Sequence, residues 1–447
     1  MRPFKQARLR PLLLGVTIAL GLAWSAAADM IGHGGMVRSV AVSPDGKTVL
    51  TGSFDYTAKL WDFVEQRALA ELDAHAGPVN AVAFHPDGRR AITGSDDGSA
   101  ILWDLAMGAP VLRFAGHEAK VMAVAISRDG ALAATGGWDR TLRIWDVTNG
   151  ALRRSIAQPS NVNAVAFGAY GKTVLTGGHD GIIRVWNVEK GTLLGKLAGH
   201  DWGVSQIAVS PYGGRALSAS TDATLRLWDL DELSEIGTMT GHDGPVLAVV
   251  FSPDGRTALS AGRDGYLIHW DLATGDTIRV IKAHEQPVWA TAFTPDGRFA
   301  ISASSDERVR VWHLATGDQI GLVGEGAAEP KPWLESSHPG AKVFRKCARC
   351  HSLIVDGLRR SGPHFSGLFG RRVGSVPGYN YSAALRDRDF VWDDETLYSL
   401  FHEGPDVFLP GTKMPVQRIP SDEQLAQLID YLREITAVPI DGAGTSD

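Results

Sequence analysis

The sequence predicts a multidomain protein in which a large all-β domain of seven repeated units precedes a smaller all-α domain. Two observations predict the repeats: a Trp-Asp pair or a close variant returns every 41 or 42 residues, and Pro-Asp-Gly turns separate β-rich segments. A change of composition after Gly324 marks the second domain. With 21% charged and 44% hydrophobic residues, the 447-residue chain has the composition of folded domains rather than of a disordered or membrane-embedded protein.

The first element in chain order, residues 1–28, is predicted to be a secretory signal peptide. Four basic residues and no acid precede an apolar stretch of about 13 residues, and an Ala-x-Ala site ends at Ala28. A membrane-spanning helix needs about 20 apolar residues, so we expect cleavage after Ala28 and no membrane anchor. The basic residues are Arg2, Lys5, Arg8 and Arg10. The expected location of the mature protein is the periplasm.

The charge of the mature chain argues against nucleic acid as a partner. Without the four basic residues of the leader, 40 Lys and Arg stand against 50 Asp and Glu, a net charge of −10. A nucleic-acid-binding protein usually carries a basic patch or stripe, and the sequence gives no sign of one.

The repeated units share four residue types in fixed register. The tryptophans are Trp61, Trp103, Trp145, Trp186, Trp228, Trp270 and Trp312. An Asp lies six residues before each Trp, a Ser or Thr four residues before each Asp, and a His 22 residues before six of the seven Asp. Gln158 replaces the His of the fourth unit.

This register predicts one buried hydrogen-bond chain per unit. An unpaired buried polar group costs about 1–3 kcal/mol, so a His, a hydroxyl, an Asp and a Trp are tolerated together only if they satisfy one another. No four-stranded unit can bury both faces alone, so the units are expected to stack in a ring. The His and Asp positions follow the repeat instead of converging on one point, which indicates scaffold residues and not a metal or catalytic site.

The pattern resembles the WD-repeat family, which implies a seven-bladed β-propeller over residues 29–325. Members of that family often complete the last blade with an amino-terminal strand. Cleavage after Ala28 leaves only four residues before His33. We therefore expect residues 318–324 to supply the outer strand of the seventh blade.

After a predicted linker at residues 326–336, the sequence Cys347-Ala-Arg-Cys350-His351 contains the only two cysteines of the chain. C-x-x-C-H is the attachment signature of c-type haem. A redox-active dithiol would open a helix after a strand in a βαβ unit, and a zinc site would need four ligands; neither context is present.

Residues 337–437 resemble a class I, mitochondrial-like cytochrome c, and residues 438–447 are expected to form a disordered tail. The resemblance rests on C-x-x-C-H, GPHFSGLFGRRVGS, PGYNYSAAL, the segment around Trp392, PGTKM and a final amphipathic helix that begins at Ser421. It implies an all-α domain with one covalent haem c held by Cys347 and Cys350. It also implies axial ligands His351 and Met414, support of His351 by Pro363, and haem propionates bonded by Arg371, Tyr381 and Trp392.

The function favoured by these features is single-electron transfer, with the propeller as a scaffold that docks a redox partner protein in the periplasm. An iron with both axial positions filled cannot easily bind a substrate, which favours an electron-transfer protein over an enzyme. Two alternatives stay open: an oxidoreductase with a second cofactor or substrate site on the propeller, and a haem-based sensor. The histidines outside the repeat pattern, His85, His179 and His269, are not clustered in the sequence.

A candidate docking face lies where the His loops and the Asp turns of the repeats open. Residues beside these positions vary from unit to unit and include Trp and Arg, which are enriched at binding hot spots. The candidate partner-binding residues are Arg38, Phe54, Trp138, His179, Trp202, Arg263 and Trp289.

Overall fold

The computed structural model describes residues 29–320, 336–353, 360, 362–377, 379, 381–412, 414 and 416–436. The predicted signal peptide, the predicted tail and all of the predicted linker except Ser336 lie outside the described residues.

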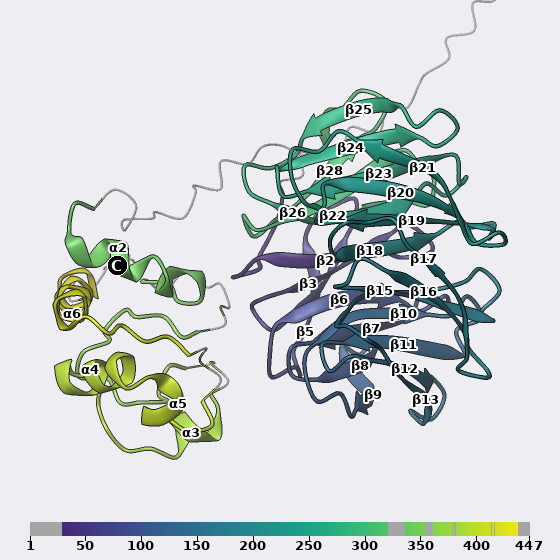
Figure 1. Ribbon diagram of the computed structural model, residues 1–447. Coiled ribbons are helices and arrows are strands. Elements are labelled where there is room, and N and C mark those ends of the chain that lie inside the picture. Colours follow the sequence, from purple (N-terminus) through teal and green to yellow (C-terminus); the bar gives the residue numbers. More distant parts are fainter. Residues whose placement is uncertain are drawn as a thin grey trace, which may run out of the picture.

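The amino-terminal domain is an all-β propeller of seven blades (Figure 1). The first six blades are four-stranded antiparallel sheets in which consecutive strands are neighbours. The innermost strands are β2 (Val37–Val42), β6 (Val79–Phe84), β10 (Val121–Ile126), β14 (Val162–Phe167), β18 (Val204–Val209), β22 (Val246–Phe251) and β26 (Val288–Phe293). The second strands are β3 (Thr48–Ser53), β7 (Arg90–Ser95), β11 (Leu132–Gly137), β15 (Thr173–Gly178), β19 (Arg215–Ser220), β23 (Thr257–Gly262) and β27 (Phe299–Ser304).

The third strands carry the repeated tryptophans, and the outer strands complete the blades. The third strands are β4 (Ala58–Asp62), β8 (Ser99–Asp104), β12 (Thr141–Asp146), β16 (Ile183–Asn187), β20 (Thr224–Asp229), β24 (Tyr266–Asp271) and β28 (Arg308–His313). The outer strands of the first six blades are β5 (Ala68–Leu72), β9 (Ala109–Ala115), β13 (Leu152–Ala157), β17 (Leu193–Leu197), β21 (Ser234–Thr240) and β25 (Thr277–Lys282).

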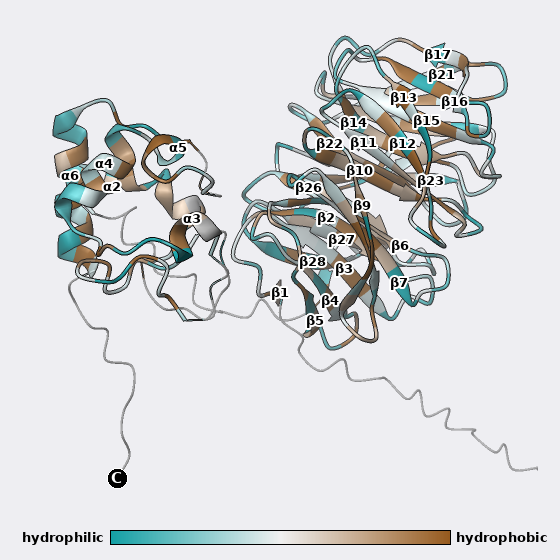
Figure 2. Cartoon of the chain, turned by 90° about the horizontal axis from the view of Figure 1, so that it is seen from below, coloured by the Kyte–Doolittle hydropathy of each residue, from teal (hydrophilic) through white to brown (hydrophobic). Residues whose placement is uncertain are grey.

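Close packing between blades depends on small residues in the second strands. A Cβ added to Gly52 on β3 would lie 2.8 Å from Cγ1 of Val79 on the next blade, and one added to Gly94 would lie 2.9 Å from Cγ1 of Val121. Both faces of these strands are buried, because neighbouring blades cover them. Figure 2 shows hydrophilic residues gathered in the loops at the periphery of the propeller.

The predicted hydrogen-bond chain is present in six blades. In the fifth, Trp228 Nε1 donates to Ser218 Oγ at 2.8 Å, and that hydroxyl lies 2.7 Å from His200 Nε2. His200 Nδ1 lies 2.8 Å from Oδ2 of Asp222, so the chain connects the third strand to two loops.

The fourth blade keeps a shortened form of this chain. Thr176 Oγ1 donates to Gln158 Oε1 at 3.1 Å and accepts from Trp186 Nε1 at 3.0 Å. Asp180 has no His partner and pairs with Arg184, whose Nη2 lies 2.6 Å from Asp180 Oδ2. A local ion pair therefore replaces the link that the missing His would make.

Closure of the ring differs from the expectation. Two short strands pair with β28: β1 (Met30–Ile31) opposite Arg308 and Val309, and β29 (Gln319–Ile320) opposite Val311 and Trp312. The expectation that residues 318–324 supply the outer strand is confirmed in part, because β29 pairs with β28, and β1 adds a second short strand; residues 321–324 lie outside the described residues. Two residues are enough for β1 because it needs to cover only the first part of β28.

Asp29 fixes this closure from a buried position. Its carboxylate pairs with Arg308 Nη1 at 3.1 Å and with Arg310 Nε at 3.2 Å, and it accepts a hydrogen bond from the Gln319 side chain. The Asp29 side chain is only 2% exposed. The first described residue thus connects the amino-terminal strand to both β28 and β29.

The carboxyl-terminal domain contains short helices joined by irregular segments. They are α2 (Pro339–Phe344), the 3₁₀ helix η1 (Cys347–Arg349), α3 (Ala383–Arg386), α4 (Asp394–His402), α5 (Pro405–Phe408) and α6 (Asp422–Thr436). Among the described residues of this domain, strand-like pairing is limited to one bridge between Arg372 and Val391. The domain therefore contains helices, as expected. That these helices form an all-α cytochrome c fold stays a prediction.

Helices α2 and α6 form the packing contact on which this domain is built. A Cβ on Gly340 would lie 1.9 Å from Gln427 O, so only glycine permits this approach. The rings of Phe344 and Tyr431 lie 5.9 Å apart inside the same core. None of the helices in the described part of the chain has the length and apolar character needed to cross a membrane.

We predict that Asp29→Asn lowers the free energy of unfolding by about 2 kcal/mol, because Arg308 loses its anion at a largely buried site and Arg310 keeps only Asp306, at 3.7 Å. Glu65→Gln is the matched control, since Glu65 pairs with Arg67 at an exposed site where an ion pair contributes about 0–1 kcal/mol. Urea denaturation of the mature protein measures both changes. Equal effects of the two substitutions would refute a closing role for Asp29.

A second prediction concerns acid stability. Burial lowers the pKa of His117, His200 and His242 below the ordinary value of 6.5, against the opposing effect of their Asp partners. Below about pH 6.5 the unfolded chain therefore binds protons that the folded chain does not, and the free energy of unfolding falls as the pH falls. Denaturant midpoints at a series of pH values measure this slope.

The control for that slope comes from the fourth blade. Changing the three histidines to Gln, the residue found at position 158, removes their titration while retaining hydrogen-bonding side chains. We expect the triple variant to be less stable overall but to show a shallower slope between about pH 7.5 and pH 5.5. An unchanged slope would contradict the assignment to these histidines.

Candidate functional site

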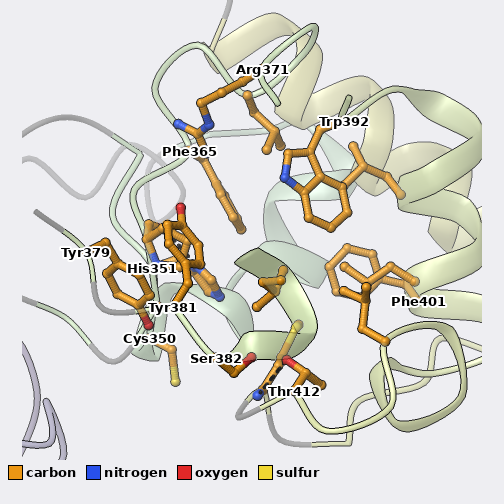
Figure 3. A pocket seen from close by; sticks show the side chains of 18 of the residues that line it. Cys350, His351, Phe365, Arg371, Tyr379, Tyr381, Ser382, Trp392, Phe401 and Thr412 are labelled. Atoms are coloured by element: carbon orange, nitrogen blue, oxygen red, sulfur yellow. Dashed lines mark hydrogen bonds between the residues drawn. The ribbon is translucent and has the colours of Figure 1, made fainter. Parts of the chain in front are cut away.

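One pocket in the carboxyl-terminal domain collects most of the predicted cofactor-binding residues (Figure 3). Those that line it are Cys350, His351, Pro363, Arg371, Tyr381, Trp392 and Met414. Much of the remaining lining is apolar, including Phe365, Leu368, Leu397 and Phe401. Cys347 lies just behind the wall, buried in the domain core, and its carbonyl accepts the backbone N–H of Cys350 at 3.0 Å.

His351 has the form and orientation of a metal ligand. Its Nδ1 lies 2.7 Å from Pro363 O, and because a carbonyl only accepts, Nδ1 carries the proton and Nε2 keeps its lone pair. The imidazole stacks on Phe365 with ring centres 4.4 Å apart. Burial lowers the pKa of His351 to about 4, so the ring is neutral at physiological pH. A neutral imidazole held by its other nitrogen is the usual ligand geometry.

Met414 reaches the same pocket from a different part of the chain. It follows α5 and the PGT turn, and its backbone N–H donates to Thr412 Oγ1 at 3.2 Å. Its half-buried side chain packs against the domain core and contributes to the pocket wall. The site thus offers one nitrogen ligand and one thioether ligand from separate segments.

The predicted propionate-binding residues line the pocket but have partners of their own. Arg371 donates from Nη1 to Ser366 O at 2.9 Å and from Nη2 to His364 O at 2.8 Å. The Tyr381 hydroxyl accepts from the Val376 backbone N–H at 3.3 Å. Ser382 Oγ is buried in the pocket wall without a hydrogen-bond partner among the described residues.

The environment of the two thiols differs from that of a reactive dithiol. Cys347 and Cys350 are unpaired, and burial raises the pKa of Cys347 to about 12. A catalytic thiol needs a lowered pKa, so this environment disfavours the dithiol alternative.

The donor set fits a haem. The pocket is apolar and offers a neutral imidazole and a thioether, with two adjacent thiols and, among the described residues, a buried hydroxyl without a hydrogen-bond partner. These features match the needs of a covalently attached porphyrin with two axial ligands. Cys347 and Cys350 would hold the porphyrin, and His351 and Met414 would face the iron.

Six of the seven candidate partner-binding residues meet at the mouth of the propeller channel. Arg38, Phe54, Trp138, His179, Arg263 and Trp289 line it. Trp202 lies outside this lining and is 67% exposed. Within the described residues no group of three or more His, Cys, Asp or Glu could hold a metal ion, so His85, His179 and His269 form no second metal centre there.

One residue of the site was missed from the sequence. Tyr56, on the first blade, is the only propeller residue among those that line the haem-sized pocket. It follows the repeat residue Asp55 in a turn with φ of 74°. The corresponding residues of the other repeats are Gly98, Arg140, Gly181, Ala223, Gly265 and Glu307, so an aromatic residue at this position was an available signal.

Comparisons with known proteins cover both domains. The family model described as "WD domain, G-beta repeat" matches seven segments that together span more than half of the chain. The segments are residues 25–62, 66–104, 108–146, 150–187, 191–229, 233–271 and 275–313.

The remainder of the chain is similar to proteins named cytochrome c. The protein from Sesamum indicum is 41% identical over 99 residues, which make up 22% of this chain and 88% of the relative. The protein from Nigella damascena is 40% identical over 102 residues, 23% of this chain and 91% of the relative. The protein from Gibberella zeae is 39% identical over 98 residues, 22% of this chain and 92% of the relative.

We predict that Gly362→Ala displaces the imidazole, because a Cβ at this position would lie 2.3 Å from His351 Cε1 and 2.5 Å from Nδ1. The loss of stability should be about 1–3 kcal/mol, as for other overpacked sites, and thermal unfolding measures it. Gly237→Ala is the control, since a Cβ there meets open space and should change stability by no more than about 0.5 kcal/mol. Similar effects at both positions would contradict the proposed contact.

Proposed function

Because the chain belongs to the WD40 repeat family and its carboxyl-terminal domain to the cytochrome c family, we propose that the protein is an exported, class I-like c-type cytochrome. It carries single electrons through one covalent haem. Its propeller docks a partner protein in the periplasm, with Trp138 and Trp202 as the exposed aromatic candidates on the docking face.

The observation that carries this proposal is the pair of ligands on one pocket. His351, held through Pro363, and Met414 both line it, so the protein itself can fill both axial positions of an iron between them. A site with both positions filled has no open coordination position for a substrate. When bound, the haem supplies reversible one-electron chemistry at its iron.

The residues of the pocket then tune and protect this centre. The Pro363 carbonyl fixes the tautomer and orientation of His351. Phe365, Leu368 and Phe401 line the pocket and would exclude water from a porphyrin held there, which would favour the less charged state of its iron. Arg371 places a half-buried positive charge at the pocket wall, where the propionates would lie.

Export is supported by the leader alone. Residues 1–28 have the basic, apolar and small-residue segments of a signal peptide. The proposal therefore places the mature protein in the periplasm and requires no membrane-spanning segment after cleavage.

Haem attachment is the first test. Expression with a cytochrome c assembly system should give a haem-stained band that survives denaturing electrophoresis, because thioether bonds are covalent. Cys347→Ala or Cys350→Ala should weaken the stain, and the double variant should lose it. Arg349→Ala, inside the same motif but without a thiol, is the control and should keep the stain. A band without haem in the unaltered protein would refute the proposed function.

The axial ligand is tested separately. The ferric protein should show the long-wavelength sulfur-to-iron absorption band that thioether ligation produces, and Met414→Ala should abolish it while leaving the haem covalently attached. Met107→Ala is the matched control, since Met107 is an exposed propeller residue. Persistence of the band in Met414→Ala would show that another group is the ligand.

A further inference from the structure

The two domains meet where the propeller channel opens. Cys350, a proposed haem-attachment residue, lines both the haem-sized pocket and the channel mouth. Arg360 is buried between the domains, with Nη1 3.4 Å from Glu307 Oε1 and 3.5 Å from Gly34 O. Both views show β2 and β26 as the inner strands nearest the helical domain (Figures 1 and 2). Among the described residues of the propeller, Tyr56 alone lines the pocket.

The charges at this mouth do not cancel. Its acidic residues are already engaged: Asp96 with Lys120, Asp97 with His75, and Glu307 with Arg360. Its other cations have no carboxylate partner among the described residues. They are Arg38, Arg263 and Lys346. The mouth of the channel is therefore locally positive, although the chain as a whole carries an excess of acidic residues.

Arg38 is the least exposed of these cations, and its guanidinium contacts an aromatic side chain. Its Cζ lies over the ring of Trp289, 4.1 Å from the ring centre, within the range of a cation–π contact. Burial lowers the pKa of Arg38 to about 10, with Asp96 opposing the shift, so the group stays protonated at neutral pH. None of its hydrogen-bond donors has a partner within the described residues.

The contacts on offer at this point are those of the guanidinium and of the indole beside it. An arginine whose side-chain donors have no hydrogen-bond partner among the described residues, held 4.1 Å from an indole ring centre, offers the positive charge and the flat apolar surface that a small polarisable anion needs.

We propose that the channel mouth beside Cys350 is a binding site for a small anionic redox molecule, with Arg38 as its main charged contact and Trp289 as a supporting contact. The inference rests on the proposed function, because the anion exchanges one electron with the haem. One centre is oxidised as the other is reduced, and no bond breaks and no proton moves. With this site, the propeller binds a small molecule as well as docking a partner protein.

Direct binding is tested with hexacyanocobaltate(III), a redox-inert trianion. Calorimetric titration into the haem-loaded full chain should show one site whose affinity falls as salt is added. Arg38→Gln should weaken binding at least tenfold, and Arg38→Lys, which keeps the charge, should retain most of it. Arg215→Gln is the matched control, because Arg215 is exposed beside the turn at the opposite end of the strands, and it should bind as the unaltered protein does.

Electron exchange gives an independent readout. The reduced protein is mixed with hexacyanoferrate(III), an anionic oxidant, or with tris(phenanthroline)cobalt(III), a cationic one. Arg38→Gln should slow oxidation by the anion at least fivefold and leave oxidation by the cation unchanged, whereas a loss of folding would slow both. The cationic oxidant also reports on the electron-transfer function by itself.

The outcomes separate the two proposals. If the trianion binds Arg38→Gln and the unaltered protein equally, and both oxidants act on both proteins at equal rates, the anion site is refuted while electron transfer stands. If the reduced haem reacts with neither oxidant in the unaltered protein, the proposed function itself fails.

Discussion

The hydrogen-bond chain from Trp through Ser or Thr to His and Asp is the constraint on which the rest of the molecule depends. It joins the second and third strands of a blade to the loop that enters the blade, as Trp228, Ser218 and His200 show. Each chain fixes one loop relative to one turn, so six of them place the loops of the ring on one face. The channel mouth, and the helical domain that covers part of it, are positioned by these loops.

Burial acts on the two domains in different ways. In the propeller it keeps His117, His200 and His242 neutral, so that each donates and accepts within its blade. In the helical domain it keeps His351 neutral, and the second ring nitrogen has no hydrogen-bond partner among the described residues. The same physical effect therefore completes the hydrogen-bond chains in one domain and leaves a neutral imidazole at the pocket in the other. The difference lies in the second nitrogen, which meets a hydroxyl in the blades and an open pocket at His351.

Much of this could be predicted from the sequence, because the repeat register and the C-x-x-C-H motif are local patterns. The blades, their hydrogen-bond chains and the grouping of His351 with Met414 follow from such patterns. Ring closure could not be predicted in full, since a two-residue strand has no periodicity and β1 pairs with residues 277 and 279 positions away. The place of Tyr56 at the pocket also depends on how two separately folded domains meet, which no local pattern encodes.

The placement of both cysteines in the helical domain has a consequence for the protein as a redox device. The propeller contains no thiol, so its integrity depends on hydrogen bonds, packing and the ion pairs of Asp29. Under the proposed function, oxidation or reduction of a haem in the pocket would make or break no covalent bond in the propeller.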